Sequence, residues 1–147
     1  MKLRLIALFA ILFSQTLRAQ SETLSMASII ADAERYVQVV EREYGQQIVR
    51  MEFDLISTTK EAYRTLSGGL EYGIAAFGDA NIKDIDLKIY KFVSDQWVLV
   101  QQDNSKEKFA MVTVKPELTA QYMIEINAYE LQENAGVAHY GLMVFHP

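Results

Sequence analysis

The chain changes its hydrophobic periodicity at Gly45. Between Thr23 and Tyr44, apolar residues recur every three or four positions, whereas after Gly45 they alternate with polar residues. The first spacing places apolar side chains on one side of an α-helix, and the second places them on one face of a β-strand. The sequence therefore predicts one amphipathic helix followed by β structure.

The predicted helix lies within residues 20–45. Gly45 suits the position just after its end, because glycine adopts positive φ without steric penalty. The apolar stripe either packs on the protein's own sheet or faces a partner or a second copy. In the second interpretation Ile30, Val37, Val40 and Tyr44 are the candidate partner-binding residues. The whole stripe consists of Met26, Ile30, Ala33, Val37, Val40 and Tyr44.

Residues 46–147 contain about eight short segments that read as strands, separated by turn residues. No helical pattern lies between them, which disfavours a parallel βαβ architecture. Regularly spaced strands with turn signals are typical of sandwiches and barrels. The sequence therefore predicts a mainly β protein, an antiparallel jelly-roll-like sandwich preceded by the helix. The expected strands are 49–55, 61–66, 70–77, 85–89, 97–102, 109–114, 122–128 and 137–145.

The first 19 residues have the composition of a cleavable signal peptide. Lys2 and Arg4 precede an unbroken apolar run at 5–13, and a polar stretch follows that ends at Ala19. The run is shorter than the roughly 20 residues that a membrane-spanning helix needs. We therefore expect an exported protein, periplasmic or secreted, of bacterial type, without a stable membrane anchor after cleavage.

Charge and cysteine content narrow the functional classes. Removing the leader takes away three of the 14 basic residues and none of the 19 acidic ones, which leaves a formal charge of −8. An acidic chain lacks the basic footprint of a nucleic-acid-binding protein. The sequence has no cysteine, so disulfides, thiolate metal sites and cysteine nucleophiles are excluded together.

Four short segments resemble bacterial pre-peptidase C-terminal domains over residues 47–147. They are Asp84-Ile85-Asp86-Leu87, Val100-Gln101-Gln102-Asp103, the tyrosine-led strand 121–126 and the aromatic strand 139–144. The resemblance implies a jelly-roll-like sandwich that serves as a non-catalytic module of a secreted protein. Thr119-Ala120-Gln121 stands where that family usually has a glycine before the tyrosine-led strand.

Asp79, Asp84 and Asp86 lie close together in sequence, beside Asn81. Oxygen ligands of this kind suit calcium, so the cluster is a candidate metal site, although it lacks the spacing of a known calcium loop. The alternative is that these acids are solvated or hydrogen-bond their own turn. Asp84 and Asp86 share one face of a strand, which also leaves open an acid/base pair of a glycan-acting enzyme.

No other catalytic or cofactor motif is recognisable, so no catalytic residue and no cofactor is assigned. His139 and His146 are seven residues apart and fall on opposite faces of a regular strand. Trp97 and several tyrosines either pack within the sandwich or are exposed for contact with a glycan or peptide. The sequence favours an exported, non-enzymatic binding module that contacts a protein or a glycan, with a calcium-stabilised structural domain as the alternative.

Overall fold

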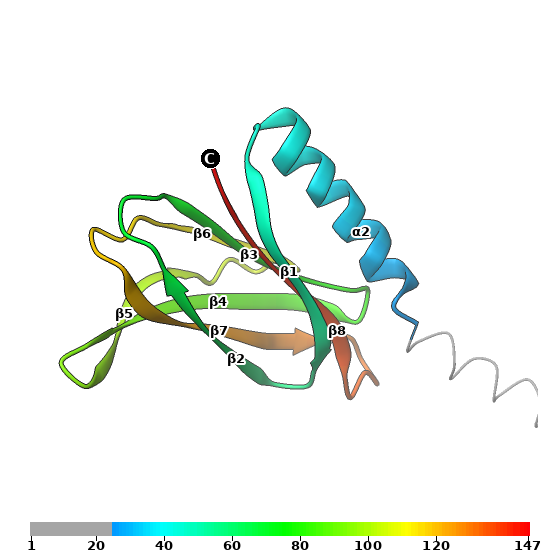
Figure 1. Cartoon of the computed structure of the whole chain (residues 1–147). Helices are drawn as coiled ribbons and strands as arrows, with labels where there is room; N and C mark the ends of the chain where they lie inside the picture. Colours follow the sequence, from blue (N-terminus) through cyan, green and yellow to red (C-terminus); the bar gives the residue numbers. More distant parts are fainter. Residues whose placement is uncertain (1–24) are drawn as a thin grey trace, which may run out of the picture.

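The computed structural model of the protein describes residues 25–147. They form one helix and two four-stranded antiparallel sheets that pack face to face (Figure 1). The mainly β sandwich predicted from the periodicity is confirmed, whereas the predicted signal peptide lies outside the described residues. The strands are β1 (Gln47–Ile56), β2 (Thr59–Leu66), β3 (Tyr72–Gly78), β4 (Ile82–Val93), β5 (Gln96–Asp103), β6 (Phe109–Val114), β7 (Ala120–Leu131) and β8 (Ala138–His146).

The strand order is β1-β8-β3-β6 in the first sheet, here called sheet A, and β2-β7-β4-β5 in the second, sheet B. Successive strands therefore alternate between the sheets, except at the β4–β5 hairpin, which stays within sheet B. The edge strands are β1 and β6 in sheet A and β2 and β5 in sheet B. The alternation closes the ends of the sandwich with short connections.

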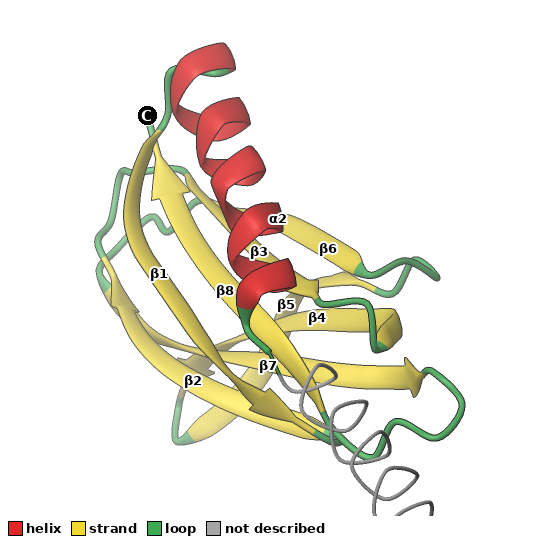
Figure 2. Cartoon of the chain, turned by 90° about the vertical axis from the view of Figure 1, so that its right-hand side faces the viewer, coloured by secondary structure: helices red, strands yellow, loops and turns green. Residues whose placement is uncertain are grey.

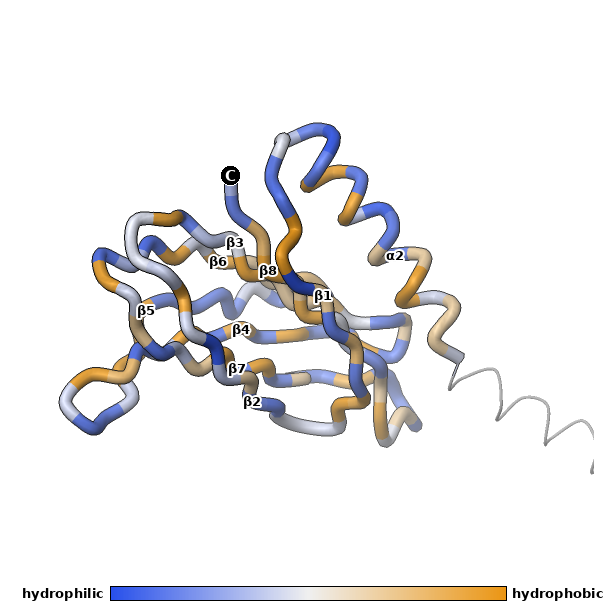
Figure 3. Tube along the Cα trace, in the orientation of Figure 1, coloured by the Kyte–Doolittle hydropathy of each residue, from blue (hydrophilic) through white to orange (hydrophobic). Residues whose placement is uncertain are grey.

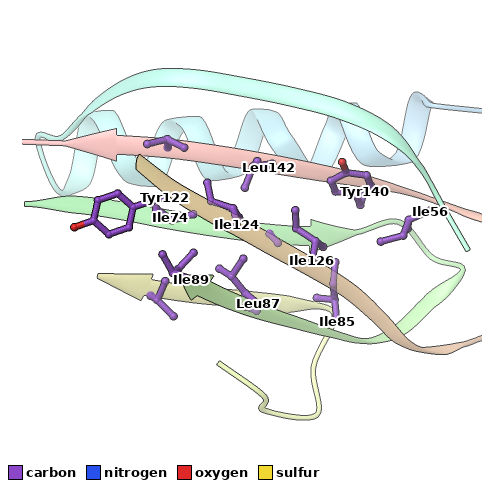
Figure 4. Packing of buried hydrophobic residues seen from close by; sticks show 14 of the residues in the cluster. Ile56, Ile74, Ile85, Leu87, Ile89, Tyr122, Ile124, Ile126, Tyr140 and Leu142 are labelled. Carbon is purple, nitrogen blue, oxygen red and sulfur yellow. The ribbon is translucent and has the colours of Figure 1, made fainter. Parts of the chain in front are cut away.

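The main core lies between the two sheets (Figure 4). One face of each inner strand contributes branched aliphatic side chains that are completely removed from solvent. Each such burial stabilises the fold by about 1.5–3 kcal/mol relative to an exposed side chain. The completely buried members that Figure 4 labels are Ile74, Ile85, Leu87, Ile89, Ile124, Ile126 and Leu142.

The helix forms a third layer on the outer face of sheet A (Figure 2). It comprises α2 (Ala27–Val37) and a π-helical continuation, η1 (Gln38–Glu43). The predicted role of Gly45 is confirmed, since its φ is +63° and the next N–H, of Gln46, donates to the Val40 carbonyl at 3.0 Å. No helix in the described part of the chain is long and apolar enough to span a membrane.

The buried side of the helix agrees with the predicted stripe only in part. Ala33 and Val40 of the stripe are buried against sheet A together with Ile29, while Ile30 is 47% exposed and Tyr44 is 69% exposed. Apolar residues occur in adjacent pairs at 29–30, 36–37 and 39–40, so the sequence offers a wide apolar arc. Periodicity alone does not fix which side of that arc meets the sheet, and the helix docks by the side that carries Ile29 and Tyr36.

Strand β1 also departs from simple alternation. A bulge between Ile48 and Arg50 shifts the register against β8 and leaves Val49 48% exposed. Met51 and Phe53 then face the helix layer. In a bulge, two residues of one strand oppose a single residue of the partner strand, and this changes the directions in which the neighbouring side chains point.

Candidate functional site

An apolar groove lies between the C-terminal half of the helix and the β6 side of sheet A. We call it the helix groove, and its volume is about 670 Å³. The helix forms one wall and the outward-facing side chains of three strands form the floor. The residues that define it are Val39, Val40 and Tyr44 on the wall and Met111, Met143 and Phe145 on the floor.

Two glycines shape the sheet surface beneath the helix. Gly73 of β3 pairs with Phe145 of β8, and Gly141 of β8 pairs with Phe77 of β3. A Cβ added to Gly73 would lie 2.2 Å from the Phe145 ring, and one added to Gly141 would lie 2.3 Å from the Phe77 ring. Each aromatic ring thus fills the space above a glycine, an arrangement that needs the absence of a side chain there. Gly73 itself lines the groove.

Tyr36 closes the inner end of the groove from the helix. Its ring centroid lies 4.8 Å from that of Phe77 and 4.9 Å from that of Phe109, within the range of favourable aromatic pairs. Burial raises the pKa of the Tyr36 phenol, and the neighbouring Asp32 carboxylate raises it further against the opposing effect of Arg35. The phenol therefore stays neutral and offers a hydrogen-bonding group without a charge.

The lining carries one charged residue, Glu71, which is exposed. Gln46 and Thr113 supply neutral polar groups. Pockets that bind ligands are mostly apolar with a few polar groups that fix orientation, and their volumes are roughly 300–1,000 Å³. The helix groove has these properties and is the candidate binding site.

The structure places two of the four predicted partner-binding residues at the helix groove. Val40 and Tyr44 line it. Val37 is half-buried, and Ile30 lies on the exposed side of the helix.

Sequence reasoning missed the floor of the groove. Phe109, Met111, Met143 and Phe145 belong to two expected strands, but none of them was singled out as a candidate binding residue. A signal was present in 138–145, where apolar residues occupy both faces of the strand. Such continuous runs indicate strands that are covered on both sides.

The three acidic residues proposed as metal ligands have different surroundings. Asp79 is buried, and its carboxylate accepts hydrogen bonds from the Asn81 N–H at 2.8 Å and the His139 N–H at 2.9 Å. The His139 ring nitrogen Nδ1 lies 3.1 Å from the same carboxylate. Asp79 therefore ties the β3–β4 turn to the start of β8.

Asp84 is buried, with 6% of its surface exposed, and its Oδ1 atom has no hydrogen-bond partner. Burial raises the pKa of its carboxyl group, and the carboxylates of Asp86 and Glu130 raise it further against the effect of Lys106. Asp86 is half-buried. Within residues 25–147, no three His, Cys, Asp or Glu side chains are grouped so that they could hold a metal ion.

No protein-family model matches the sequence, and no curated protein matches it. Among solved structures, the pre-peptidase C-terminal domain of a Bacillus anthracis collagenase is 11% identical, with a TM-score of 0.48. The match covers 65% of this chain and 87% of that one.

Two other solved structures are similar over about the same part of the chain. A periplasmic inhibitor of g-type lysozyme from Aeromonas hydrophila is 9% identical, with a TM-score of 0.47 over 67% of this chain and 85% of that one. A surface-associated copper-binding protein from Methylomicrobium album BG8 is 6% identical, with a TM-score of 0.49 over 66% and 93%. These comparisons record a partial likeness to β-sandwich proteins, which includes the family that the sequence segments resemble, and they establish no family for this chain.

Proposed function

We propose that the protein is an exported, non-enzymatic binding module whose helix groove takes up an apolar side chain of a protein partner. The observation that carries the proposal is the groove itself, an apolar hollow of about 670 Å³ between helix and sheet. Apolar or aromatic anchors seated in well-packed pockets contribute most of the binding energy at protein interfaces.

The lining favours a protein partner over a glycan. Met111, Met143 and Phe145 form an apolar floor, whereas a sugar brings many hydroxyl groups that would lose their water partners there. A buried polar group without a hydrogen bond costs about 1–3 kcal/mol. A bulky aliphatic or aromatic side chain meets the same surface without that cost.

The charge of the groove lining indicates which kind of residue lies beside the apolar side chain in the partner. Glu71 is the charged residue of the lining, and the whole sequence carries a net charge of −5. A Lys or Arg next to the anchor would complement both. Complementary charges of this kind raise association rates and fix orientation more than they raise affinity.

The proposed export rests on residues 1–19, whose basic, apolar and polar stretches follow the order of a signal peptide. A cysteine-free chain folds in an oxidising compartment without disulfide chemistry. The periplasm and the cell exterior both suit a module that meets its partner outside the cytoplasm.

The test has two parts, binding of a neutral apolar dye and selection of peptides. N-phenyl-1-naphthylamine should fluoresce on addition of the protein, and the substitution Met111→Asp should abolish that response by placing a charge on the groove floor. A random peptide library displayed on phage should yield sequences with a bulky apolar residue beside Lys or Arg, and the variant Glu71→Lys should bind them several-fold more weakly.

Val49→Asp is the matched control, because Val49 is 48% exposed on a strand of the same sheet and Met111 is 47% exposed. Val49 does not line the groove. Selected peptides that bind the Met111→Asp variant as tightly as the parent would refute the proposal, as would dye binding that both Asp variants lose equally.

A further inference from the structure

The β4–β5 hairpin projects beyond the sandwich, at the lower left of Figure 1. Pairing of β4 with β7 ends at Lys91 and Tyr122, whereas pairing of β4 with β5 continues to Val93 and Gln96. We call the segment from Phe92 to Val100 the arm. Towards its tip it is a two-stranded ribbon, and such a ribbon by itself is marginally stable in water.

The arm is apolar on both faces. Phe92 and Leu99 lie on one face, and Val93 and Val98 on the other, and each is 39–47% exposed. The hydropathy colouring in Figure 3 shows apolar segments on the projecting hairpin. Contiguous exposed apolar surface of this kind marks an interaction site.

Aromatic contacts hold the arm against the outer face of sheet B. The ring centroid of Trp97 lies 4.9 Å from that of Phe92 and 5.6 Å from that of Tyr63 on β2. These contacts hold the arm in one position and still leave Phe92, Val93, Val98 and Leu99 partly exposed. A fixed arm presents its free edge in a constant orientation.

The outer edge of β5 lacks the usual protection of an edge strand. Residues 96–102 contain no charged residue and no proline, the two features with which native proteins block pairing. In sheet A, by contrast, a backbone N–H of the edge strand β6 is occupied, since that of Met111 donates to the Asp103 carboxylate at 3.0 Å. Burial alone would raise the pKa of Asp103, but the hydrogen bonds that its carboxylate accepts from the Met111 N–H, the Ser105 N–H and the Ser105 hydroxyl together lower it.

We propose that β5 pairs antiparallel with β5 of a second copy of the chain, so that the two B sheets join into one across a two-fold axis. An unpaired edge calls for another strand, and residues 96–102 of a second copy offer an edge that is uncharged in the same way. A two-fold interface is self-complementary by construction.

A bulge in β5 selects the register of this pairing. Side chains that oppose each other across an antiparallel pair lie on the same face. In a regular strand, residues on the same face are an even number of positions apart. The two-fold axis that relates two paired copies of such a strand therefore passes through a residue and not between two residues. The irregularity at Val100 changes this, because Trp97 opposes Phe92 and Gln102 opposes Lys88, which places both on one face.

Val98 and Gln101 lie together on the other face, opposite Lys91 and Ile89 respectively. An axis between Leu99 and Val100 consequently matches the faces, with Val98 of one copy opposite Gln101 of the other.

Charge favours the same register. An axis through Leu99 would set Asp95 opposite Asp103 in two places, and like charges directly opposite each other are destabilising. An axis between Leu99 and Val100 sets Gln96 opposite Asp103 instead. The pairing then contains no like-charge pair within β5.

The mass of the purified protein should be that of a dimer in sedimentation velocity and should fall by half on dilution. Trp97 is the one tryptophan in the sequence, so its emission reports on the arm alone and should shift to the red over the same dilution. Leu99→Lys should give a monomer at every concentration with an unchanged circular dichroism spectrum, whereas Val49→Lys, a similarly exposed control, should remain dimeric.

The absence of cysteine allows a direct test of register. Opposed side chains have Cβ atoms about 4.5–5.5 Å apart, and a disulfide needs about 3.5–4.5 Å, so the two strands must approach each other by about 1 Å for the bond to form. Val98→Cys and Gln101→Cys chains should therefore cross-link when mixed under oxidising conditions, and neither chain should cross-link with itself.

A protein that stays monomeric at the highest attainable concentration would overturn the proposal, and so would a dimer that the Val49 substitution dissociates and the Leu99 substitution does not. Cross-linking of Val98→Cys chains with themselves would refute the register. The Leu99→Lys variant should still bind N-phenyl-1-naphthylamine, so failure of the dimer and failure of the helix groove are separate results.

Discussion

The two outer faces of the sandwich differ in composition and in whether a third layer covers them. The outer face of sheet A is apolar and lies under the helix, and every residue of β3 is buried as a result. Away from the arm and the aromatic residues that contact it, the outer face of sheet B carries polar side chains, among them the Lys88–Glu125 ion pair, whose Nζ and Oε1 atoms are 3.1 Å apart. That face has no third layer among the described residues, and β7 alternates between buried and half-buried positions from Ile124 to Ala128.

The difference shows that the composition of the outward residues determines how many layers form. An apolar sheet face must be covered, because exposed apolar area is costly at about 25 cal/mol per Å². A polar face is stable in water as it is. The helix is therefore a structural layer first, and its end forms the groove wall because it covers sheet A incompletely.

The largest expected difference between the two faces is in the loss of stability when an aromatic residue on each is replaced. Phe77 is completely buried beneath the helix, whereas Tyr63 on sheet B is 54% exposed. We expect Phe77→Ala to lower the free energy of unfolding by about 3–5 kcal/mol and Tyr63→Ala to lower it by about 1 kcal/mol or less. Urea denaturation followed by circular dichroism measures both, and equal losses would contradict the contrast.

A smaller effect is expected from two neighbouring helix residues. Ile29 is completely buried and Ile30 is 47% exposed. Ile29→Ala should cost about 2–4 kcal/mol through the lost contacts and the cavity left behind, whereas Ile30→Ala should cost about 0.5 kcal/mol or less. If Ile30→Ala were the more damaging change, the helix would dock by the face predicted from its periodicity and not by the one described.

Asp84, a buried residue near the start of β4, offers a stabilising change. Its raised pKa means that the folded state holds a proton that the unfolded state has lost, so stability falls as the pH rises from the ordinary value of 3.8 through the raised one. Asp84→Asn should therefore raise the free energy of unfolding at neutral pH by about 1 kcal/mol, and the gain should vanish below pH 3.8. Asp86→Asn is the control, and a gain independent of pH would point to another cause.

The smallest effect is expected from calcium. The Asp79 carboxylate already accepts hydrogen bonds from the N–H groups of Asn81 and His139, so binding an ion would break contacts in the β3–β4 turn. We expect the same thermal midpoint in calcium and in a chelator, as measured by scanning calorimetry. A midpoint that rises with calcium would support the calcium-stabilised alternative instead.

Much of the fold could be predicted from the sequence because alternation and turn residues act locally. All eight expected strands are present, and Gly45 ends the helix where positive φ was expected. The bulge at Val49 could not be foreseen, since it depends on how β1 pairs with β8. Likewise, the choice of Ile29 over Ile30 depends on the sheet surface that the helix meets.

The candidate site was harder to predict than the fold. Val40 and Tyr44 could be singled out from the helix alone, but the groove needs β3, β6 and β8 side by side. These strands are distant in sequence, and no pairwise pattern sets their order. The arm presented the opposite difficulty, because its strand at 97–102 was expected from the sequence, whereas the exposure of the arm depends on where pairing of β4 with β7 ends.

Strand β8 lies between β1 and β3, and it carries two residues of the groove floor. Sheet A therefore has no continuous surface until residues 138–146 have been made, and before then the helix can meet only the separate parts of that surface that β1, β3 and β6 supply. Formation of such distant contacts is slow, because a long loop must close first. The order of synthesis thus delays assembly of sheet A until β8 has been made, and loss of β8 alone would leave β1 without its partner strand, β3 paired only with β6, and the helix without its contact with Met143.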